Sequence, residues 1–298
     1  MDMLKIEGLC KRFGDKTVLN GLNLSVPEHS IFGFIGKNGS GKTTTMKMAL
    51  GLLKPDSGEI FVNGERVIYG GGNTNRYIGY LPDVPEFYSF MTPKEYLGFC
   101  GDIVGLPHDV TEKRAEKMLE LVGLSRETHR IKGFSRGMKQ RLGIAQALLN
   151  KPKLLICDEP TSALDPIGRK EILDILLAVK NETTVIFSTH ILADVERICT
   201  DVAFLNDGVV GVQGKLSDIK SLYRGEEYVF ELIDESGKVD LLSAFPHLSE
   251  RENGKLILSD DSKLSDVFRF IADKGIKVSR IERSEPTLES LFMEVIKK

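Results

Sequence analysis

The stretch Gly36-Lys37-Asn38-Gly39-Ser40-Gly41-Lys42-Thr43, residues 36–43, decides the fold. It completes the nearly all-apolar run IFGFIG, typical of a buried strand, and it opens TTTMKMALGLL, which has helical spacing. In that context the pattern G-x-x-x-x-G-K-[ST] predicts a loop whose backbone N–H groups cradle phosphates, with Lys42 as a cation for the β and γ phosphates. The Thr43 hydroxyl is a candidate magnesium ligand. The predicted cradle consists of Gly36, Asn38, Gly39, Ser40, Gly41, Lys42, Thr43 and Thr44.

A second apolar run, KLLICDEP at residues 153–160, ends in the carboxylates of Asp158 and Glu159. By itself this is commonly an ordinary strand end, but beside a phosphate loop it indicates a hydrolytic site at the carboxyl edge of a parallel sheet. Asp158 is then a candidate magnesium ligand, directly or through water, and Glu159 a candidate general base for the attacking water. These motifs predict a nucleotide with β and γ phosphates together with Mg²⁺.

His190 follows the buried run TVIFST. On its own such a residue is commonly a strand-end histidine with an ordinary hydrogen-bond partner. Because the carboxyl ends of parallel strands meet at one edge, it can instead reach the γ-phosphate or the attacking water. Lys42, Glu159 and His190 are therefore the predicted catalytic residues.

The bulk composition limits the partners. The chain has 298 residues, 41% hydrophobic and 28% charged, with a net charge of -3. This balance gives no general attraction to nucleic acid, and no nucleic-acid partner is expected. No apolar run approaches the roughly 20 residues that cross a bilayer, and the N-terminus lacks a signal-peptide core, so we expect a cytoplasmic chain.

Periodicity predicts an α/β protein with a mixed, mainly parallel sheet as its core. The N-terminal strands and a hairpin at 58–67 predict an antiparallel β subdomain, and residues from about 87 to 150 predict a helical insert. The pattern changes near residue 215. We therefore expect a domain at 1–215 and a small α+β domain at 216–298, with helices at 264–275 and 287–298.

The stretch GFSRGMKQ, residues 133–140, opens a helix with serine and glycine. The first N–H groups of a helix have no intrahelical partner and lie at the positive end of its dipole, so this is a second predicted point for holding a phosphate. Ser135 and Gly137 are its candidate residues. The chain thus has two predicted phosphate-holding helix starts but only one nucleotide's set of motifs.

In order and spacing, GKNGSGKTT, FSRGMKQ, LLICDEPTSALDP and STH resemble the motifs of ATP-binding subunits of ABC transporters, over roughly residues 1–215. The resemblance implies a P-loop NTPase fold of the ABC type, with ATP and Mg²⁺ as the cofactors and Phe13 stacking on adenine. It implies that Asp165 lies at a subunit boundary and that Asp83 begins a loop that senses a transmembrane partner. It also implies a head-to-tail pair of subunits, identical or not, in which Ser135 and Gly137 hold the γ-phosphate of the partner's ATP.

Three positions depart from the family's pattern. Arg136 replaces a glycine and Met138 a glutamine in the signature, and Asp83 replaces the sensing-loop glutamine. Asp83 still offers an oxygen to magnesium or water, but it adds negative charge beside the phosphates. The changes resemble a branch that powers export, often of antibiotics, lipids or polysaccharides, with a separate membrane subunit.

The resemblance implies an ATPase subunit that drives export through a separate transmembrane permease and lies peripherally on the inner face of the cell membrane. The alternatives are a soluble ABC-type ATPase and a regulatory subunit that binds nucleotide without hydrolysing it. Asp83 and Arg136 favour the regulatory reading, whereas an intact catalytic set opposes it.

An aromatic segment follows the sensing loop, and it is a candidate contact for the permease or, alternatively, part of the core. Its members are Phe87, Tyr88, Phe90, Tyr96 and Phe99.

Overall fold

The computed structural model describes residues 1–222, 228–233, 235–250, 254–259, 261–283, 288–289 and 291. Over this part of the chain two compact units form, one containing Met1–Leu216 and the other lying within Ser217–Met293. Across the described ranges, no helix combines the length and the apolar character that crossing a bilayer requires.

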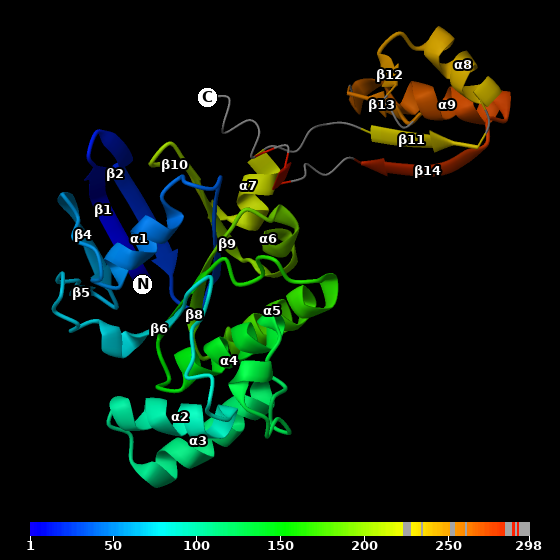
Figure 1. Cartoon of the computed structure of the whole chain (residues 1–298). Coiled ribbons are helices and arrows are strands. Elements are labelled where there is room, and N and C mark those ends of the chain that lie inside the picture. The colour runs from blue at the N-terminus through cyan, green and yellow to red at the C-terminus, as the bar shows by residue number, and fades with distance from the viewer. Residues whose placement is uncertain are drawn as a thin grey trace. The chain divides into compact units, whose positions relative to one another are not determined.

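The first unit is built on a sheet with the strand order β10-β9-β3-β8-β7-β6 (Figure 1). The parallel strands are β3 (Ile31–Gly36), β6 (Ile78–Leu81), β7 (Leu154–Asp158), β8 (Thr184–Thr189) and β9 (Asp201–Asn206), and β10 (Val209–Lys215) joins β9 antiparallel. Every residue of β3, β7 and β8 is buried, as their apolar runs predict for strands covered on both faces.

A second, antiparallel sheet has the order β2-β1-β4-β5. Its strands are β1 (Asp2–Phe13), β2 (Lys16–Pro27), β4 (Ser57–Val62) and β5 (Glu65–Arg66). The predicted hairpin turns at Asn63 and Gly64, both with positive φ, as a tight two-residue turn between twisted strands requires.

Helix α1 (Lys42–Ala49) packs between the two sheets and starts where the phosphate loop ends. Met46 of α1 belongs to one buried cluster with Leu4 and Leu24 of the antiparallel sheet and Phe34 of the central sheet. On the opposite face of β3 a Cβ at Gly33 would lie 3.1 Å from Val195 in α6 (Leu192–Ile198), so that helix covers the other side. Helix α5 (Pro166–Val179) links β7 to β8.

The predicted helical insert contains α2 (Pro93–Ile103), α3 (His108–Leu121) and α4 (Arg136–Leu148), which pack together in the lower part of Figure 1. Short 3₁₀ turns lie at Asn75–Tyr77 and Ile131–Gly133. The start of α2 is fixed by a capping box, because Thr92 accepts from the Glu95 backbone while the Glu95 carboxylate accepts from Thr92 N–H.

The second unit has an antiparallel sheet of order β12-β13-β11-β14. Its elements are α7 (Leu216–Leu222), β11 (Tyr228–Leu232), α8 (Glu235–Ala244), β12 (Leu248–Glu250), β13 (Leu256–Leu258), the 3₁₀ turn Asp261–Lys263, α9 (Leu264–Lys274) and β14 (Val278–Arg283). The core joins Phe230 of β11, Leu241 of α8 and Val267 of α9. The helix expected at 264–275 is α9, which ends at Gly275 with left-handed backbone. The helix expected at 287–298 lies almost entirely outside the described residues.

Candidate nucleotide-binding and hydrolysis site

The loops after β3, β7 and β8 leave the same edge of the central sheet. The parallel register places Ile35 beside Thr189 and Asp158 beside Ser188, so the three strands end together. A cleft of about 590 Å³ lies at this edge, within the size range of small-molecule sites. The predicted residues that line it are Phe13, Asn38, Gly39, Gly41, Lys42, Thr43, Thr44, Asp83, Glu159 and His190.

Two glycines of the phosphate loop, Gly36 and Gly41, have no room for a side chain. Gly41 has φ 112, and a Cβ there would lie 2.7 Å from Leu19 Cδ2, so a side chain would both strain the backbone and clash. A Cβ at Gly36 would lie 2.6 Å from Ser40 Oγ, and that hydroxyl is buried without a hydrogen-bond partner. A loop lined by backbone N–H groups and one unsatisfied hydroxyl is suited to an anionic ligand.

Lys42, Glu159 and His190 form a chain of polar contacts across the cleft. Lys42 Nζ donates to the Gly36 carbonyl at 2.7 Å and the Lys37 carbonyl at 3.2 Å, and it lies 3.3 Å from Glu159 Oε1. The other carboxylate oxygen, Oε2, lies 2.9 Å from His190 Nδ1. The structure thus brings together all three residues that the sequence predicts as catalytic.

Ser188 holds both acidic residues, and sequence reasoning missed it. Its hydroxyl donates to Asp158 Oδ1 at 2.6 Å and accepts from Glu159 N–H at 2.9 Å. Glu159 has φ 47, a left-handed conformation that costs a non-glycine residue on the order of 1–3 kcal/mol, so this hydrogen bond helps to stabilise it. The available signal was a polar residue directly after the run VIF at residues 185–187, still within a buried strand and opposite the end of the neighbouring strand.

The loops that carry Glu159 and His190 are joined by a second buried contact. Thr161 Oγ1 donates to Asp194 Oδ2 at 2.7 Å, and Arg169 Nε lies 3.9 Å from Asp194 Oδ1. Burial raises the pKa of Asp194, and the hydroxyl and the nearby cations oppose that rise. The start of α6 is thereby tied to the segment that follows β7.

Two carboxylates, those of Asp158 and Asp83, lie near Tyr80 of β6. Burial raises the pKa of Tyr80 to about 12, and the nearby carboxylates of Asp158 and Asp83 contribute to the rise. Tyr80 therefore keeps its proton at neutral pH. This field favours a cation next to the phosphate loop.

The predicted magnesium ligands fit that ion by donor type, because Mg²⁺ prefers a few protein oxygens together with phosphates and water. Thr43 and Asp83 line the cleft, and Asp158 is buried at its edge. Asp158 Oδ1 accepts from Ser188, and Asp83 Oδ1 accepts from Arg136 Nη2 at 3.1 Å. The carboxylate of Asp83 thus already has a cationic partner from α4.

Comparison with known proteins decides the family. A family model described as ABC transporter matches residues 19–162, and one described as the C-terminal domain of DrrA1-3-like ATP-binding proteins matches residues 214–296. The chain is 40% identical to the uncharacterized ABC transporter ATP-binding protein YxlF of Bacillus subtilis (strain 168), over 99% of each chain. The chain belongs to the ABC transporter ATP-binding family.

Two further similarities agree with this family. The bacitracin transport ATP-binding protein BcrA of Bacillus licheniformis is 37% identical over 99% of this chain and 97% of that protein. The solved structure of CbiO1 from Clostridium perfringens, titled part of the ABC transporter complex CbiONQ, is 30% identical with a TM-score of 0.67, covering 74% of this chain and 91% of that one. The chain is accordingly an ATP-binding subunit of a transporter, and the alternative of a soluble ATPase is not favoured.

As a P-loop ABC ATPase, the chain has the fold that the sequence predicts, and ABC ATPases generally hydrolyse ATP. Five predicted nucleotide contacts are not among the residues that line the cleft of Lys42. Gly36 and Ser40 belong to the phosphate loop itself, whereas Ser135, Gly137 and Asp165 lie elsewhere in the chain. Ser135 is exposed and caps α4 by accepting from Met138 N–H at 3.2 Å, with Gly137 two residues on. Asp165 is exposed and caps α5 by accepting from Gly168 N–H at 3.0 Å. In the single chain both residues are thus helix caps.

The cleft has three further lining residues that the sequence did not single out, namely Lys16, Val18 and Ser162. Lys16 and Val18 are close to Phe13 in the hairpin of β1 and β2, and Ser162 follows the Glu159 loop. Their proximity in sequence to predicted residues was the only signal available.

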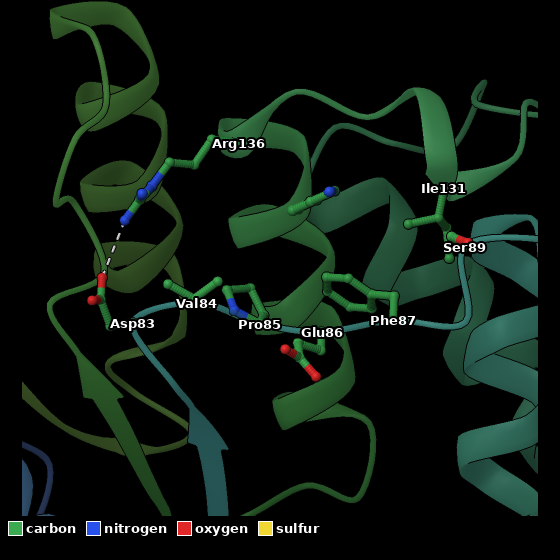
Figure 2. Close-up of a pocket in the computed structure, with 9 residues that line it drawn as sticks. Asp83, Val84, Pro85, Glu86, Phe87, Ser89, Ile131 and Arg136 are labelled. Carbon is green, nitrogen blue, oxygen red and sulfur yellow. Dashed lines mark hydrogen bonds and ion pairs between the residues drawn. The ribbon is translucent and has the colours of Figure 1, made fainter.

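A surface groove of about 430 Å³ lies beside the cleft (Figure 2). It is lined by the sensing loop, including Asp83, Pro85 and Phe87, and by residues of α4. The aromatic segment divides here, because Tyr96 is 6% exposed and donates to Gln146, whereas Tyr88 is 51% exposed. Tyr96 is thus part of the core, whereas Tyr88 stays a candidate contact for the permease.

Proposed function

We propose that this chain is a catalytically active ATPase subunit that drives export through a separate transmembrane permease. The observation that carries the proposal is the position of Glu159, with one carboxylate oxygen 3.3 Å from Lys42 and the other 2.9 Å from His190 at the wall of the cleft. A carboxylate between a phosphate-binding cation and an imidazole is placed to orient and deprotonate a water that attacks the γ-phosphate.

The cleft residues divide the work of binding and hydrolysis. Phe13 stacks on the adenine ring, and the loop from Gly36 to Thr44 holds the phosphates through its N–H groups. Lys42 exchanges its contacts with the loop carbonyls for phosphate oxygens. Glu159 acts as the base, and His190 orients Glu159 and contacts the γ-phosphate.

Thr43, Asp83 and Asp158 are the residues that would hold magnesium. When bound, that ion supplies positive charge against the β and γ phosphate oxygens. Ser188 fixes Asp158 through a 2.6 Å hydrogen bond, so that carboxylate keeps its place as the cleft fills.

We propose that Ser135, Gly137 and Asp165 complete the site of a second subunit. All three lie outside the cleft of their own chain, and Ser135 with Gly137 forms the first turn of α4, where N–H groups favour an anion. Two subunits related by a two-fold axis place each α4 against the partner's phosphate loop, making two shared sites. The pair is a homodimer or a heterodimer of similar chains.

Relatives that match over nearly the whole chain, among them a bacitracin transport protein, support the proposal that the transporter exports its substrate. The permease is proposed to dock at the groove beside the sensing loop. Tyr88 and Phe90, which are 51% and 62% exposed and adjoin the groove-lining Ser89 in sequence, extend this docking surface. This docking holds the subunit at the inner face of the cell membrane. The second unit serves as an accessory domain of the subunit.

Complementation between two inactive variants tests the shared site. Lys42→Ala removes the cation of the phosphate loop. Ser135→Asp keeps an N-cap for α4 but sets a negative charge where a partner's phosphate would lie. Each variant alone should be inactive. A mixed dimer has one intact site and can bind one ATP, so mixing the two variants should restore activity. Random pairing, which gives mixed dimers in about half of the pairs, sets the upper limit at roughly a quarter of the wild-type rate.

The control is Lys139→Ala, which removes a cation of α4 outside the cleft and should hydrolyse ATP at the wild-type rate. Wild-type activity should also rise per molecule as protein concentration rises. Failure of the mixture to recover any activity, while both variants stay folded, contradicts the shared site. Wild-type protein without turnover at every concentration contradicts the proposed hydrolysis.

A further inference from the structure

Asp83 lies where the nucleotide cleft and the surface groove meet. It lines both hollows, and its carboxylate accepts a hydrogen bond from Arg136 at the first position of α4 (Figure 2). The distance from Arg136 Nη2 to Asp83 Oδ1 is 3.1 Å. Arg136 and Asp83 are also two of the positions at which the sequence departs from the family's usual pattern, and here they are bonded to each other.

The same loop is attached to α4 at two further points. Gln140 is completely buried, and its side-chain nitrogen donates to the Asp83 carbonyl at 2.6 Å. A Cβ at Gly143 would lie 2.5 Å from Leu81 Cδ1 at the end of β6 and 3.4 Å from Pro85 Cβ in the loop, so the helix backbone packs closely against both. Positions 136, 140 and 143 recur on one face of the helix, and that face packs along the loop.

The three attachments differ in strength. Those at Gln140 and Gly143 are buried, whereas the side chains of Arg136 and Asp83 are 42% and 47% exposed. A half-exposed ion pair is weak, on the order of a twofold to fivefold effect in an equilibrium, so a competing ligand can break it without disturbing the core. The ion pair is therefore the point of this contact that can change state.

The Asp83 carboxylate cannot serve two cations equally. The carboxylate lines the cleft, and its Oδ1 already accepts from the guanidinium of Arg136, so its negative charge is shared with that cation before any divalent ion binds beside phosphates. Arg136 also offsets the negative charge that Asp83 adds to an edge where Asp158 already lies. Filling the cleft and keeping the ion pair are thus competing events.

We propose that Arg136 is a positioning residue that competes with magnesium for the Asp83 carboxylate, so that binding of magnesium and ATP releases the first turn of α4. This inference rests on the proposed function in one respect, the role of Asp83 as a magnesium ligand. Breaking the ion pair frees Arg136 and the turn at Ser135. This happens when magnesium and ATP are bound, which is the state in which that turn must approach the partner's phosphates. Breakage of the ion pair thereby couples nucleotide binding in this chain's cleft to the first turn of α4, which is proposed to contact the ATP of the partner subunit.

A double-mutant cycle tests the inference by binding alone. The measurement is the magnesium concentration that half-saturates binding of a fluorescent ATP analogue, for wild type, Arg136→Ala, Asp83→Asn and the double variant. Arg136→Ala should lower that concentration about twofold to fivefold, because magnesium no longer displaces an ion pair. Asp83→Asn should raise it, and adding Arg136→Ala to Asp83→Asn should then change nothing.

Two controls distinguish the effect of the specific ion pair between Arg136 and Asp83 from the effect of losing any positive charge at the groove. Lys139→Ala removes another cation that lines the same groove, and it should leave the magnesium requirement unchanged. Arg136→Lys keeps the charge but not the planar fork, so it should fall between wild type and Arg136→Ala. Binding of the analogue without magnesium should be equal in all arginine variants.

The outcomes distinguish the two proposals. If Asp83→Asn leaves the magnesium requirement unchanged, the assignment of Asp83 as a ligand fails and the inference fails with it. If Asp83→Asn raises the requirement but Arg136→Ala has no effect, only the inference is overturned. An equal effect of Arg136→Ala in the Asp83→Asn background overturns it as well, because the effect would not pass through that carboxylate.

Discussion

Replacing Glu159 by glutamine separates ATP binding from hydrolysis. Glutamine has the same shape and keeps hydrogen-bonding atoms near Lys42 and His190, but it carries no charge and cannot take a proton from water. We expect Glu159→Gln to retain ATP, to lose hydrolysis and to accumulate an ATP-bound dimer. Lys42→Ala should instead lose ATP binding and dimer formation together.

The magnitude of each effect follows from the geometry. A positioned general base contributes about 10² to 10⁴ in rate, which is about 3–5 kcal/mol of the barrier. The Glu159 carboxylate lies 3.3 Å from Lys42 Nζ, a separation at which the Coulomb attraction is about 5 kcal/mol before desolvation, at an effective dielectric constant of about 20. Only a part of this is net, about 1.5–3 kcal/mol for a hydrogen bond between charged groups. Because ATP must displace Lys42 from Glu159, the variant should bind ATP about tenfold more tightly or better.

The assay combines three measurements on wild type and variant. They are phosphate release, equilibrium binding of ATP with magnesium, and size-exclusion chromatography in ATP with magnesium. The matched control is Glu182→Gln, the same substitution at an exposed glutamate outside the cleft, which should behave as wild type. Turnover by Glu159→Gln within tenfold of wild type would refute the assignment of the base. Weaker ATP binding by Glu159→Gln would refute the view that the ion pair between Glu159 and Lys42 competes with ATP phosphates for Lys42.

Three other predictions concern residues around the site. Ser188→Ala should lower hydrolysis about tenfold and unfolding stability by about 1–3 kcal/mol in a urea titration, since it leaves the buried Asp158 oxygen without its donor, and Ser188→Thr should recover both. Tyr88→Asp should spare ATP binding but weaken co-purification with the permease, because that residue is 51% exposed and lies between Phe87 and Ser89, which line the groove, and undiminished co-purification would count against this docking surface. Burial raises the pKa of Asp194 above its ordinary 3.8, so its contribution to stability is present below that pH and is lost as pH rises through the folded pKa. In urea titrations, the free energy of unfolding of Asp194→Asn should therefore rise relative to that of wild type between acidic and neutral pH. A difference between the two proteins that does not depend on pH would contradict the raised pKa of Asp194.

Much of the fold could be predicted because its signals are local. The run IFGFIG and the glycines that follow it specify a buried strand, a loop with left-handed backbone and a helix start within a dozen residues, and the structure has β3, the phosphate loop and α1 there. The apolar strand that ends in Asp158 and Glu159 is equally local. The parallel-edge rule then predicted that Glu159 and His190 share one crevice, and they lie 2.9 Å apart.

The remaining contacts depend on register and on helix packing, which no local pattern encodes. Whether Ser188 faces Asp158 depends on the alignment of two strands, since a shift of one residue would turn the hydroxyl to the other face of the sheet. Arg136 and Asp83 are 53 residues apart, and they meet only because α4 packs along the sensing loop.

The sequence by itself determined the phosphate loop, the order of the motifs and the family, because each motif is read from neighbouring residues whose backbone conformation is set locally. Only the tertiary structure decided that Asp83 is paired with Arg136, that Ser188 holds both acidic residues, and that Thr161 meets Asp194. These pairs join side chains from separate strands and helices. Their formation depends on the distances that the packed sheet and helices impose, and those distances are a property of the whole fold.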